Sequence, residues 1–88
     1  MPKISQEKIT KIKEAIISLL FEKFPHSLFT AEIARELARD EEFIKALLLE
    51  LEKAAIVKRS SNFTRKIKWT LSEKAYFAYK KLSASSLA

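Results

Sequence analysis

The chain of 88 residues contains no glycine and no cysteine, and His26 is its single histidine. Phosphate-cradling loops need backbone conformations that glycine adopts most cheaply, so a glycine-rich nucleotide site is excluded. Without cysteine the chain forms neither a disulfide framework nor a thiolate metal site. A lone histidine needs a nucleophile and an orienting partner to act as a general base, and the sequence suggests neither. We therefore expect His26 to be a solvated loop residue, and we expect no enzyme activity, no metal and no cofactor.

Long apolar runs are also missing. The run AIISLLF at residues 15–21 ends at Glu22 and Lys23, far short of the roughly 18 residues that a membrane span needs. The first ten residues, MPKISQEKIT, have no apolar signal core. We therefore expect a cytoplasmic protein with no membrane partner. Asparagine, glutamine and methionine occur once each while lysine, glutamate and isoleucine are plentiful, a composition typical of a thermophile.

What is present indicates one small folded domain over residues 1–88, with an ordered core at about 5–82. Apolar residues make up 48% of the chain and charged residues 32%, which is ordinary for a folded domain and too apolar for a disordered chain. In a chain this short every element has to contribute to a single core. No internal repeat and no linker interrupts it.

Helical periodicity dominates the first two thirds of the chain. Residues 5–23 predict an amphipathic helix that Ser5 caps and Pro25 ends. Thr30 is the expected cap of a second helix at 31–38, after a short extended link, and Asp40 the expected cap of a third. The predicted inward residues of these three helices are Ile9, Ile12, Ile16, Leu19, Leu20, Ile33, Ala34, Leu37, Ile44, Leu47, Leu48 and Leu51.

The period then changes from helix to strand. The segments AIVKRSS (55–61) and RKIKWTL (65–71) are rich in strand-forming residues, and Ile67, Trp69 and Leu71 alternate with polar neighbours. The polar turn SSNFT joins them, which predicts a β-hairpin. Ser72 is the expected cap of a last helix, and the tail SASSLA (83–88) is expected to fray. The predicted core-facing residues of that helix are Ala75, Ala78, Tyr79 and Leu82.

This order of elements resembles the winged helix-turn-helix superfamily of archaeal and bacterial transcription regulators. The resemblance covers about residues 8–82, and its most telling stretches are FTAEIARELARDEEFIKALLLELEKAAIVKR and WTLSEKA. It implies an α+β, mostly α fold with a three-helix core, a short strand, a β-hairpin called the wing (residues 55–71) and a C-terminal helix. Two departures are visible, since Ala55 and Ala75 stand where the superfamily most often has glycine.

Charge is distributed unevenly along the chain. The net charge is +2 over residues 1–27, −3 over 28–54 and +7 over 55–88, which together give the formal +6. The third helix, which the superfamily presents to the major groove, is therefore acidic. Glu41 and Glu42 in its first turn have an ordinary structural role, because acids there stabilise a helix by roughly 0.3–1 kcal/mol each. The wing offers the better anchor for a phosphate backbone.

The resemblance and the charge pattern together predict contact with double-stranded DNA, anchored chiefly by the wing, in a transcription regulator. Cations around a hairpin turn contact phosphates, and an arginine at the tip is able to enter the minor groove. Wing lysines that only discourage edge-to-edge strand pairing are the plainer alternative. The expected DNA-binding residues are Arg39, Lys45, Lys58, Arg59, Asn62, Arg65, Lys66 and Lys68.

Two other interpretations remain open at this point. The acidic third helix, with Glu42 and Leu49 on its outer face, is able to serve as a docking surface for a basic protein partner. Single-stranded nucleic acid or RNA could stack on Phe63 or Trp69, although the alternation favours a core position for Trp69.

Apolar residues also lie off the main faces of the first and last helices. They are Ile17, Phe21 and Phe77. They either cover each other within the chain or form a homodimer interface.

Overall fold

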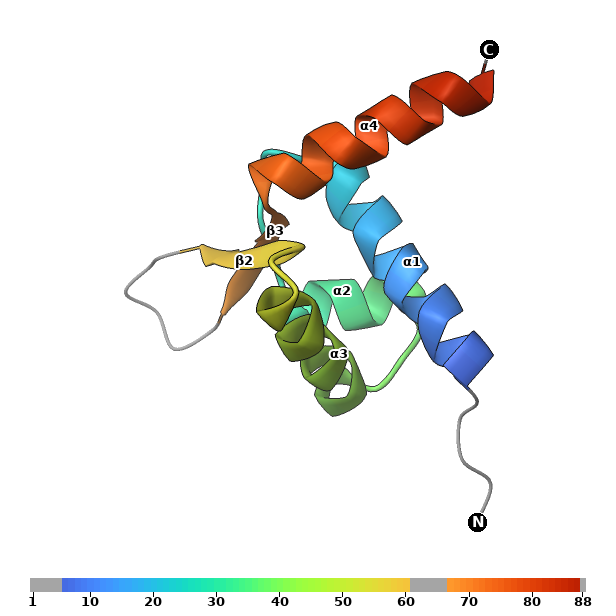
Figure 1. Cartoon of the computed structure of the whole chain (residues 1–88). Helices are drawn as coiled ribbons and strands as arrows, with labels where there is room; N and C mark the ends of the chain where they lie inside the picture. Colours follow the sequence, from blue (N-terminus) through green and yellow to red (C-terminus); the bar gives the residue numbers. More distant parts are fainter. Residues whose placement is uncertain (1–5, 61–66, 88) are drawn as a thin grey trace.

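The computed structural model describes residues 6–60 and 67–87, with the side chains of the last helix described as far as Leu82. The elements follow in the predicted order, and they are α1 (Gln6–Lys23), β1 (Leu28–Phe29), α2 (Thr30–Leu37), α3 (Glu41–Lys53), β2 (Val57–Ser60), β3 (Lys68–Leu71) and α4 (Glu73–Leu87). Figure 1 shows α2 and α3 below the small sheet, while α4 crosses the C-terminal end of α1 and extends beyond it. The mostly helical α+β fold is as predicted.

The core forms where α1, α2 and α3 meet the inner face of the sheet. Its fully buried members from the helices include Ile16, Leu20, Ile33, Ile44 and Leu48, all of which the helical periodicity predicts. The strands contribute Val57, Trp69 and Leu71, which are also buried. Burial of side chains of this size stabilises the fold by about 1.5–3 kcal/mol each, so this cluster fixes the relative positions of the three helices and the sheet.

The sheet is antiparallel, with β3 in the centre and β1 and β2 at its edges. Val57 lies opposite Leu71 and Arg59 lies opposite Trp69. The alternation of β3 holds for Trp69 and Leu71, but Thr70, one of the polar residues that alternate with them, is buried as well. Its hydroxyl has no hydrogen-bond partner among the described residues.

The first strand of the hairpin is shorter than predicted. Ala55 and Ile56, expected in the strand, precede β2 and form the turn that follows α3. The N–H of Ile56 donates to the carbonyl oxygen of Leu51 at 2.9 Å, which ties this turn to the end of the helix.

The predicted caps of α3 and α4 are confirmed. The Asp40 carboxylate accepts a hydrogen bond from the backbone N–H of Phe43 at 3.2 Å. The Ser72 hydroxyl accepts one from the N–H of Ala75 at 3.1 Å and donates to the carbonyl oxygen of Ala55 at 2.9 Å. Ser72 therefore also joins the first turn of α4 to the turn before β2.

The predicted cap of α2 is wrong. Thr30 is the first residue of the helix and Phe29 stands in the cap position, with extended backbone. The Thr30 hydroxyl instead accepts a hydrogen bond from the indole Nε1–H of Trp69 at 2.8 Å, inside the core. A buried indole N–H needs a partner, and this requirement takes the hydroxyl away from the helix end. Glu32 satisfies the cap from the other side, because its carboxylate accepts from the Phe29 N–H at 2.8 Å.

Part of the predicted core face of α4 is also wrong. Ala75 and Tyr79 are partly buried as predicted, but Ala78 and Leu82 are exposed, and Tyr76 packs inward instead. The Tyr76 ring stacks on the rings of two aromatic residues of the α1 end, with centroid distances of 4.0 Å to Phe24 and 5.0 Å to Phe21. The helix continues to Leu87 rather than ending at 82. Beyond its first turns α4 projects past the body of the domain (Figure 1), which is why its later predicted core positions lie at the surface.

Candidate nucleic-acid interface

The negative charge of the third helix is partly neutralised in the fold, because two of its glutamates form ion pairs with cations from other elements. Lys13 of α1 lies 2.7 Å from the Glu50 carboxylate. Arg59 of β2 donates two hydrogen bonds to Glu52, from Nε–H at 2.8 Å and from Nη2–H at 3.2 Å. Each pair joins α3 to a neighbouring element and offsets one negative charge. No sequence pattern indicated either pairing, since both depend on the packing of distant segments.

The remaining acids of α3 stand at its N-terminal end. Asp40 is the cap and Glu41 and Glu42 are exposed in the first turn, where the helix dipole favours negative charge. Further along, Lys45 and Lys53 are both exposed. The outer face of α3 therefore carries acids in its first turn and two exposed lysines further along, Lys45 and Lys53.

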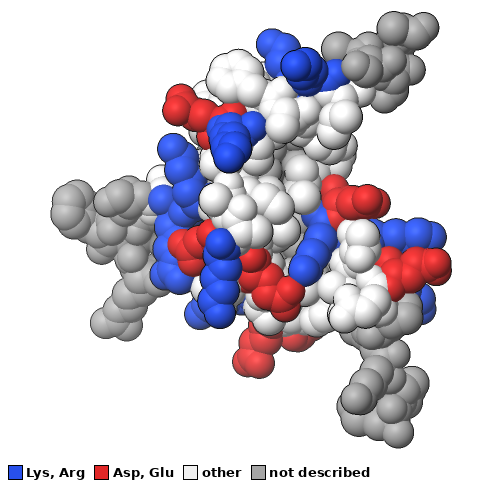
Figure 2. Space-filling view, in the orientation of Figure 1, with Lys and Arg blue, Asp and Glu red and all other residues white. Residues whose placement is uncertain are grey.

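Cations gather beside the sheet. Figure 2 shows Lys and Arg side chains along the left side of the molecule, over β2 and β3, and Asp and Glu side chains at its lower end, over α3. Lys58 is exposed, and so are Arg39 and Lys45 on the two-helix unit. Lys68 is partly buried and its ammonium group lies 4.8 Å from the centre of the Phe29 ring, a cation–π distance.

Arg59 has different surroundings from the other predicted DNA-binding residues. Besides its bidentate pair with Glu52, its guanidinium carbon lies 5.4 Å from the centre of the Trp69 ring. Trp69 itself is fully buried, so the predicted core position of this ring is confirmed and it is not available to stack on a base. Arg59 is therefore held between α3 and the core rather than standing free in solvent.

The structure locates some of the predicted DNA-binding residues and not others. It brings together three cations at the base of the wing, which are Lys58, Arg59 and Lys68. Four residues considered in the rest of the hairpin lie outside the described residues. Three of them are predicted to contact DNA, Asn62, Arg65 and Lys66, and the fourth is Phe63, considered for stacking on a base.

The terminal helices cover each other in part. Ile17 and Phe21 of α1 are partly buried, and the Phe21 ring contacts the rings of Tyr76 and Tyr79 of α4. Phe77 remains 61% exposed, and among the described residues its ring makes an edge contact with the ring of its neighbour Tyr76. The pair of helices thus covers Phe21 and leaves Phe77 on the surface.

The two residues considered for docking a basic partner on α3 have different environments. Glu42 is exposed, whereas Leu49 is partly buried and packs against the core. Leu49 therefore offers less apolar surface to a partner than its position on the helix suggested.

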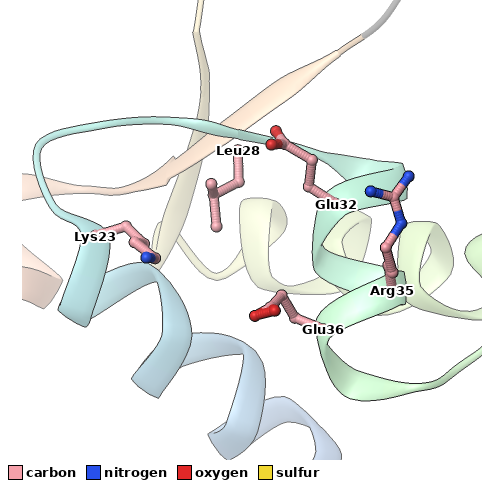
Figure 3. A pocket seen from close by; sticks show the side chains of 5 residues that line it. All are labelled: Lys23, Leu28, Glu32, Arg35 and Glu36. Atoms are coloured by element: carbon pink, nitrogen blue, oxygen red, sulfur yellow. The ribbon is translucent and has the colours of Figure 1, made fainter.

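A shallow hollow of about 250 Å³ lies between the end of α1 and α2. It is lined by Lys23, Leu28, Glu32, Arg35 and Glu36, and Figure 3 shows side chains of both helices around it. Two cations and two carboxylates balance its charge. No sequence pattern predicts this hollow, because its lining comes from α1, β1 and α2, which meet only in the folded chain. His26, close by in the chain, is exposed as expected.

The described part of the chain offers no metal site and no membrane helix. Residues 6–60 and 67–87 contain no group of three histidine or acidic side chains that could hold a metal ion. None of the helices in those same residues is long and apolar enough to cross a membrane.

Comparison with known proteins gave matches of structure alone. No family model matches the chain, and no curated protein does. A solved structure of a Lactococcus lactis ZitR mutant in apo form superposes with a TM-score of 0.72 at 29% identity, over 91% of this chain and 60% of that one. The chain thus spans less than two thirds of the length of that ZitR structure.

Two structures of Staphylococcus aureus MepR also match. One is described as a transcription regulator of the multidrug efflux pump MepA, with a TM-score of 0.68, 19% identity and coverage of 94% of this chain and 69% of that one. The other is a mutant bound to an oligodeoxyribonucleotide, with a TM-score of 0.65 and 19% identity over 86% of this chain and 61% of that one. With the described order of helices and the three-stranded sheet, these likenesses show that the chain has the winged helix-turn-helix fold.

Proposed function

We propose that this chain is the DNA-binding domain of a transcription regulator, anchored on the duplex mainly by the cations of its wing. The observation that carries the proposal is which charged side chains form ion pairs within the chain and which remain exposed. Glu50 and Glu52 are offset by Lys13 and Arg59 within the chain. Lys58 on the base of the wing is exposed and has no ion pair among the described residues, so it is available to a phosphate.

Phosphate contacts from lysine and arginine supply most non-specific DNA affinity and fix the register of a protein on the duplex. We assign this role to Lys58 and Lys68 at the base of the wing, and to the cations in the rest of the hairpin. The likeness to MepR bound to an oligodeoxyribonucleotide supports DNA binding as the function of this fold, and the choice of residues rests on their charge and exposure. The further contacts that we assign are phosphate contacts from Arg65 and Lys66, a hydrogen bond from Asn62, and secondary contacts from Arg39 and Lys45.

The third helix would lie near the major groove. Lys45 is the residue best suited to a base edge or a phosphate there, because lysine donates to guanine acceptors. Glu42 is able to accept from the amino group of cytosine, and Leu49 to touch a thymine methyl group. Acids in the first turn make this helix a weak anchor, which is why the proposal assigns most of the affinity to the wing.

We also propose that the protein acts as a homodimer built from its terminal helices. Phe77 is 61% and Leu82 69% exposed, on a helix that extends past the body of its own chain (Figure 1). A second copy related by two-fold symmetry would let the projecting ends of the two α4 helices cover each other in one self-complementary interface. Ile17 and Phe21 would support that interface from beneath, since α4 already packs on Phe21. Two wings would then meet one duplex about one helical turn or a multiple apart.

The proposal is tested by titrating a random-sequence fluorescent duplex with the purified protein at several salt concentrations. If Lys45 and the four wing cations Lys58, Arg65, Lys66 and Lys68 neutralise five phosphates per chain, log Kd should rise with log salt with a slope of roughly 4 to 5. Binding that does not change with salt, or no binding at low salt, would contradict the proposal. Selection of a preferred binding sequence from random duplexes would follow only if Kd depends steeply on salt concentration.

A further inference from the structure

Arg59 and Glu52 form a paired contact with two hydrogen bonds. Nε–H of Arg59 donates to Oε2 of Glu52 at 2.8 Å, and Nη2–H donates to Oε1 at 3.2 Å. The side chains are 46% and 32% exposed, so solvent weakens the attraction. The fork geometry still fixes the orientation of the guanidinium plane, because a bidentate contact adds geometric specificity to the charge attraction. The contact is therefore geometrically specific even though it is energetically modest.

The same guanidinium group also lies against the core. Its central carbon is 5.4 Å from the centre of the Trp69 ring, and Trp69 lies directly opposite Arg59 in the sheet. Trp69 is fully buried and held by its hydrogen bond to Thr30 of α2. Arg59 thus contacts α3 through its hydrogen bonds and β3 through the indole ring.

The pair spans the turn that sets the angle between α3 and the wing. Between Glu52 and Arg59 the chain turns at Ala55, whose φ of 62° lies in the left-handed region. Two backbone hydrogen bonds hold the start of this turn, from Ala55 N–H to Glu52 O at 3.0 Å and from Ile56 N–H to Leu51 O at 2.9 Å. The side-chain pair closes the same turn from outside, because it connects the last turn of α3 to β2.

Lys58 provides a contrast one residue away. Successive side chains of a strand point to opposite faces, so Lys58 lies on the face away from Glu52. It is exposed, and no ion pair or ring contact holds it among residues 6–60 and 67–82. Neighbouring cations on β2 therefore have different surroundings, and of these two only Arg59 has its charge offset within the described chain.

We propose that Arg59 is a positioning residue that holds β2, at the base of the wing, at a fixed angle to α3, and that Lys58 rather than Arg59 contacts the phosphate backbone. The inference rests on the proposed DNA-binding function. A phosphate that met the Arg59–Glu52 pair would face almost no net charge, so it would release few counterions. The pair helps binding because it holds α3 and β2 in the relative position that the duplex requires before the duplex binds.

The experiment compares R59Q with K58Q as its matched control, since each removes one cation from adjacent positions of β2. The salt slope and the affinity for the random duplex are measured for both. K58Q should reduce the slope by about 0.9, the value for one lost phosphate contact. R59Q should leave the slope unchanged and weaken binding about twofold to fivefold at every salt concentration. R59K should behave like R59Q, because lysine keeps the charge but loses the fork.

The proposal is overturned if R59Q reduces the slope as much as K58Q does and R59K restores it, which would make Arg59 a phosphate contact. It is equally overturned if R59Q changes neither the slope nor the affinity. E52Q supplies an independent variant should R59Q fold poorly. Removing an acid should by charge alone strengthen DNA binding, so weaker binding by E52Q supports a loss of geometry. Stronger binding by E52Q would count against positioning.

A measurement without DNA separates this inference from the function on which it rests. Amide hydrogen exchange at Ala55 and Ile56 should speed up several-fold in R59Q and stay unchanged in K58Q. If wild-type protein binds no duplex but this exchange pattern is found, the proposed function fails while the contact between α3 and β2 keeps its positioning role. If wild-type protein binds and R59Q matches it in exchange and affinity, the positioning role fails alone.

Discussion

Two buried threonines of this chain have opposite hydrogen-bonding states. The Thr30 hydroxyl accepts from the Trp69 indole at 2.8 Å, whereas the Thr70 hydroxyl has no partner among the described residues. A buried donor left without an acceptor costs about 1–3 kcal/mol. We therefore expect T30V to lower the free energy of unfolding by that amount, because it leaves the indole N–H without its acceptor.

T70V is the matched control for this prediction, since it makes the same chemical change one residue from Trp69. Replacing a hydroxyl that makes no hydrogen bond should leave stability unchanged or raise it. Urea unfolding followed by tryptophan fluorescence measures both variants. Equal losses of unfolding free energy in the two variants would show that the hydrogen bond between Trp69 and Thr30 makes no net contribution to stability.

The two alanines that replace the superfamily's usual glycines also differ. Ala55 has a φ of 62° and bears the steric cost of the left-handed region, while Ala75 lies in the first turn of α4 and is not among the described residues with positive φ. We expect A55G to stabilise the protein by about 1 kcal/mol and A75G to destabilise it by about 0.5–1 kcal/mol. Thermal unfolding of the two variants tests the contrast, and destabilisation by A55G would contradict it.

At the scale of the element, α3 combines acids in its first turn with lysines further along. Glu41 and Glu42 lie at its N-terminus and Lys45 and Lys53 are exposed further along. A helix that approaches DNA in this way should depend on Lys45 and be hindered by Glu42. We expect K45Q to weaken duplex binding and reduce the salt slope by about 0.9, and E42Q to leave the affinity unchanged or raise it, as measured by the fluorescent titration.

The same pair of variants distinguishes DNA contact from capture of a basic protein by α3. Under protein capture, loss of the Glu42 charge would weaken the interaction and Lys45 would matter little. Circular dichroism of both variants provides the folding control, because both substitutions are on exposed positions of one helix. A tighter-binding K45Q would contradict the assignment of α3 to the groove.

At the scale of the whole molecule, the exposed end of α4 predicts self-association. Phe77 is 61% exposed on a helix that projects beyond α1 (Figure 1). Burying an aromatic ring of this kind in a symmetric contact removes apolar area from water, which stabilises by about 25 cal/mol per Å². We expect F77S to shift the protein toward monomer in sedimentation velocity and to weaken duplex binding, since two linked wings bind more tightly than one.

A78S is the control for that prediction, because Ala78 is an exposed neighbour on the same helix and the change adds only a hydroxyl group. It should leave the sedimentation pattern as in wild type. A wild-type protein that is monomeric at every concentration tested would remove the homodimer from the proposal. DNA binding by single chains would survive that result.

Apolar periodicity and the types of the capping and turn residues were enough to predict the order of elements, the core of α1 to α3 and the caps at Asp40 and Ser72. These features depend on near neighbours, since the apolar spacing of a helix and its capping residue lie within a few positions of each other. The wing cations were also visible as a local concentration of charge in the last third of the chain. The assignment of individual cations to DNA remains a prediction.

Only the tertiary structure decided which of the side chains singled out in the sequence already have a partner within the folded chain. Thr30 does not cap α2 because Trp69, far along the chain, needs an acceptor. The later core positions predicted for α4 are exposed because this helix projects past the end of α1. Glu50 and Glu52 are unbalanced acids in the sequence, and packing places a cation beside each. Sequence spacing determines what each element presents, and only packing between elements determines which charges and hydroxyl groups remain available to a partner.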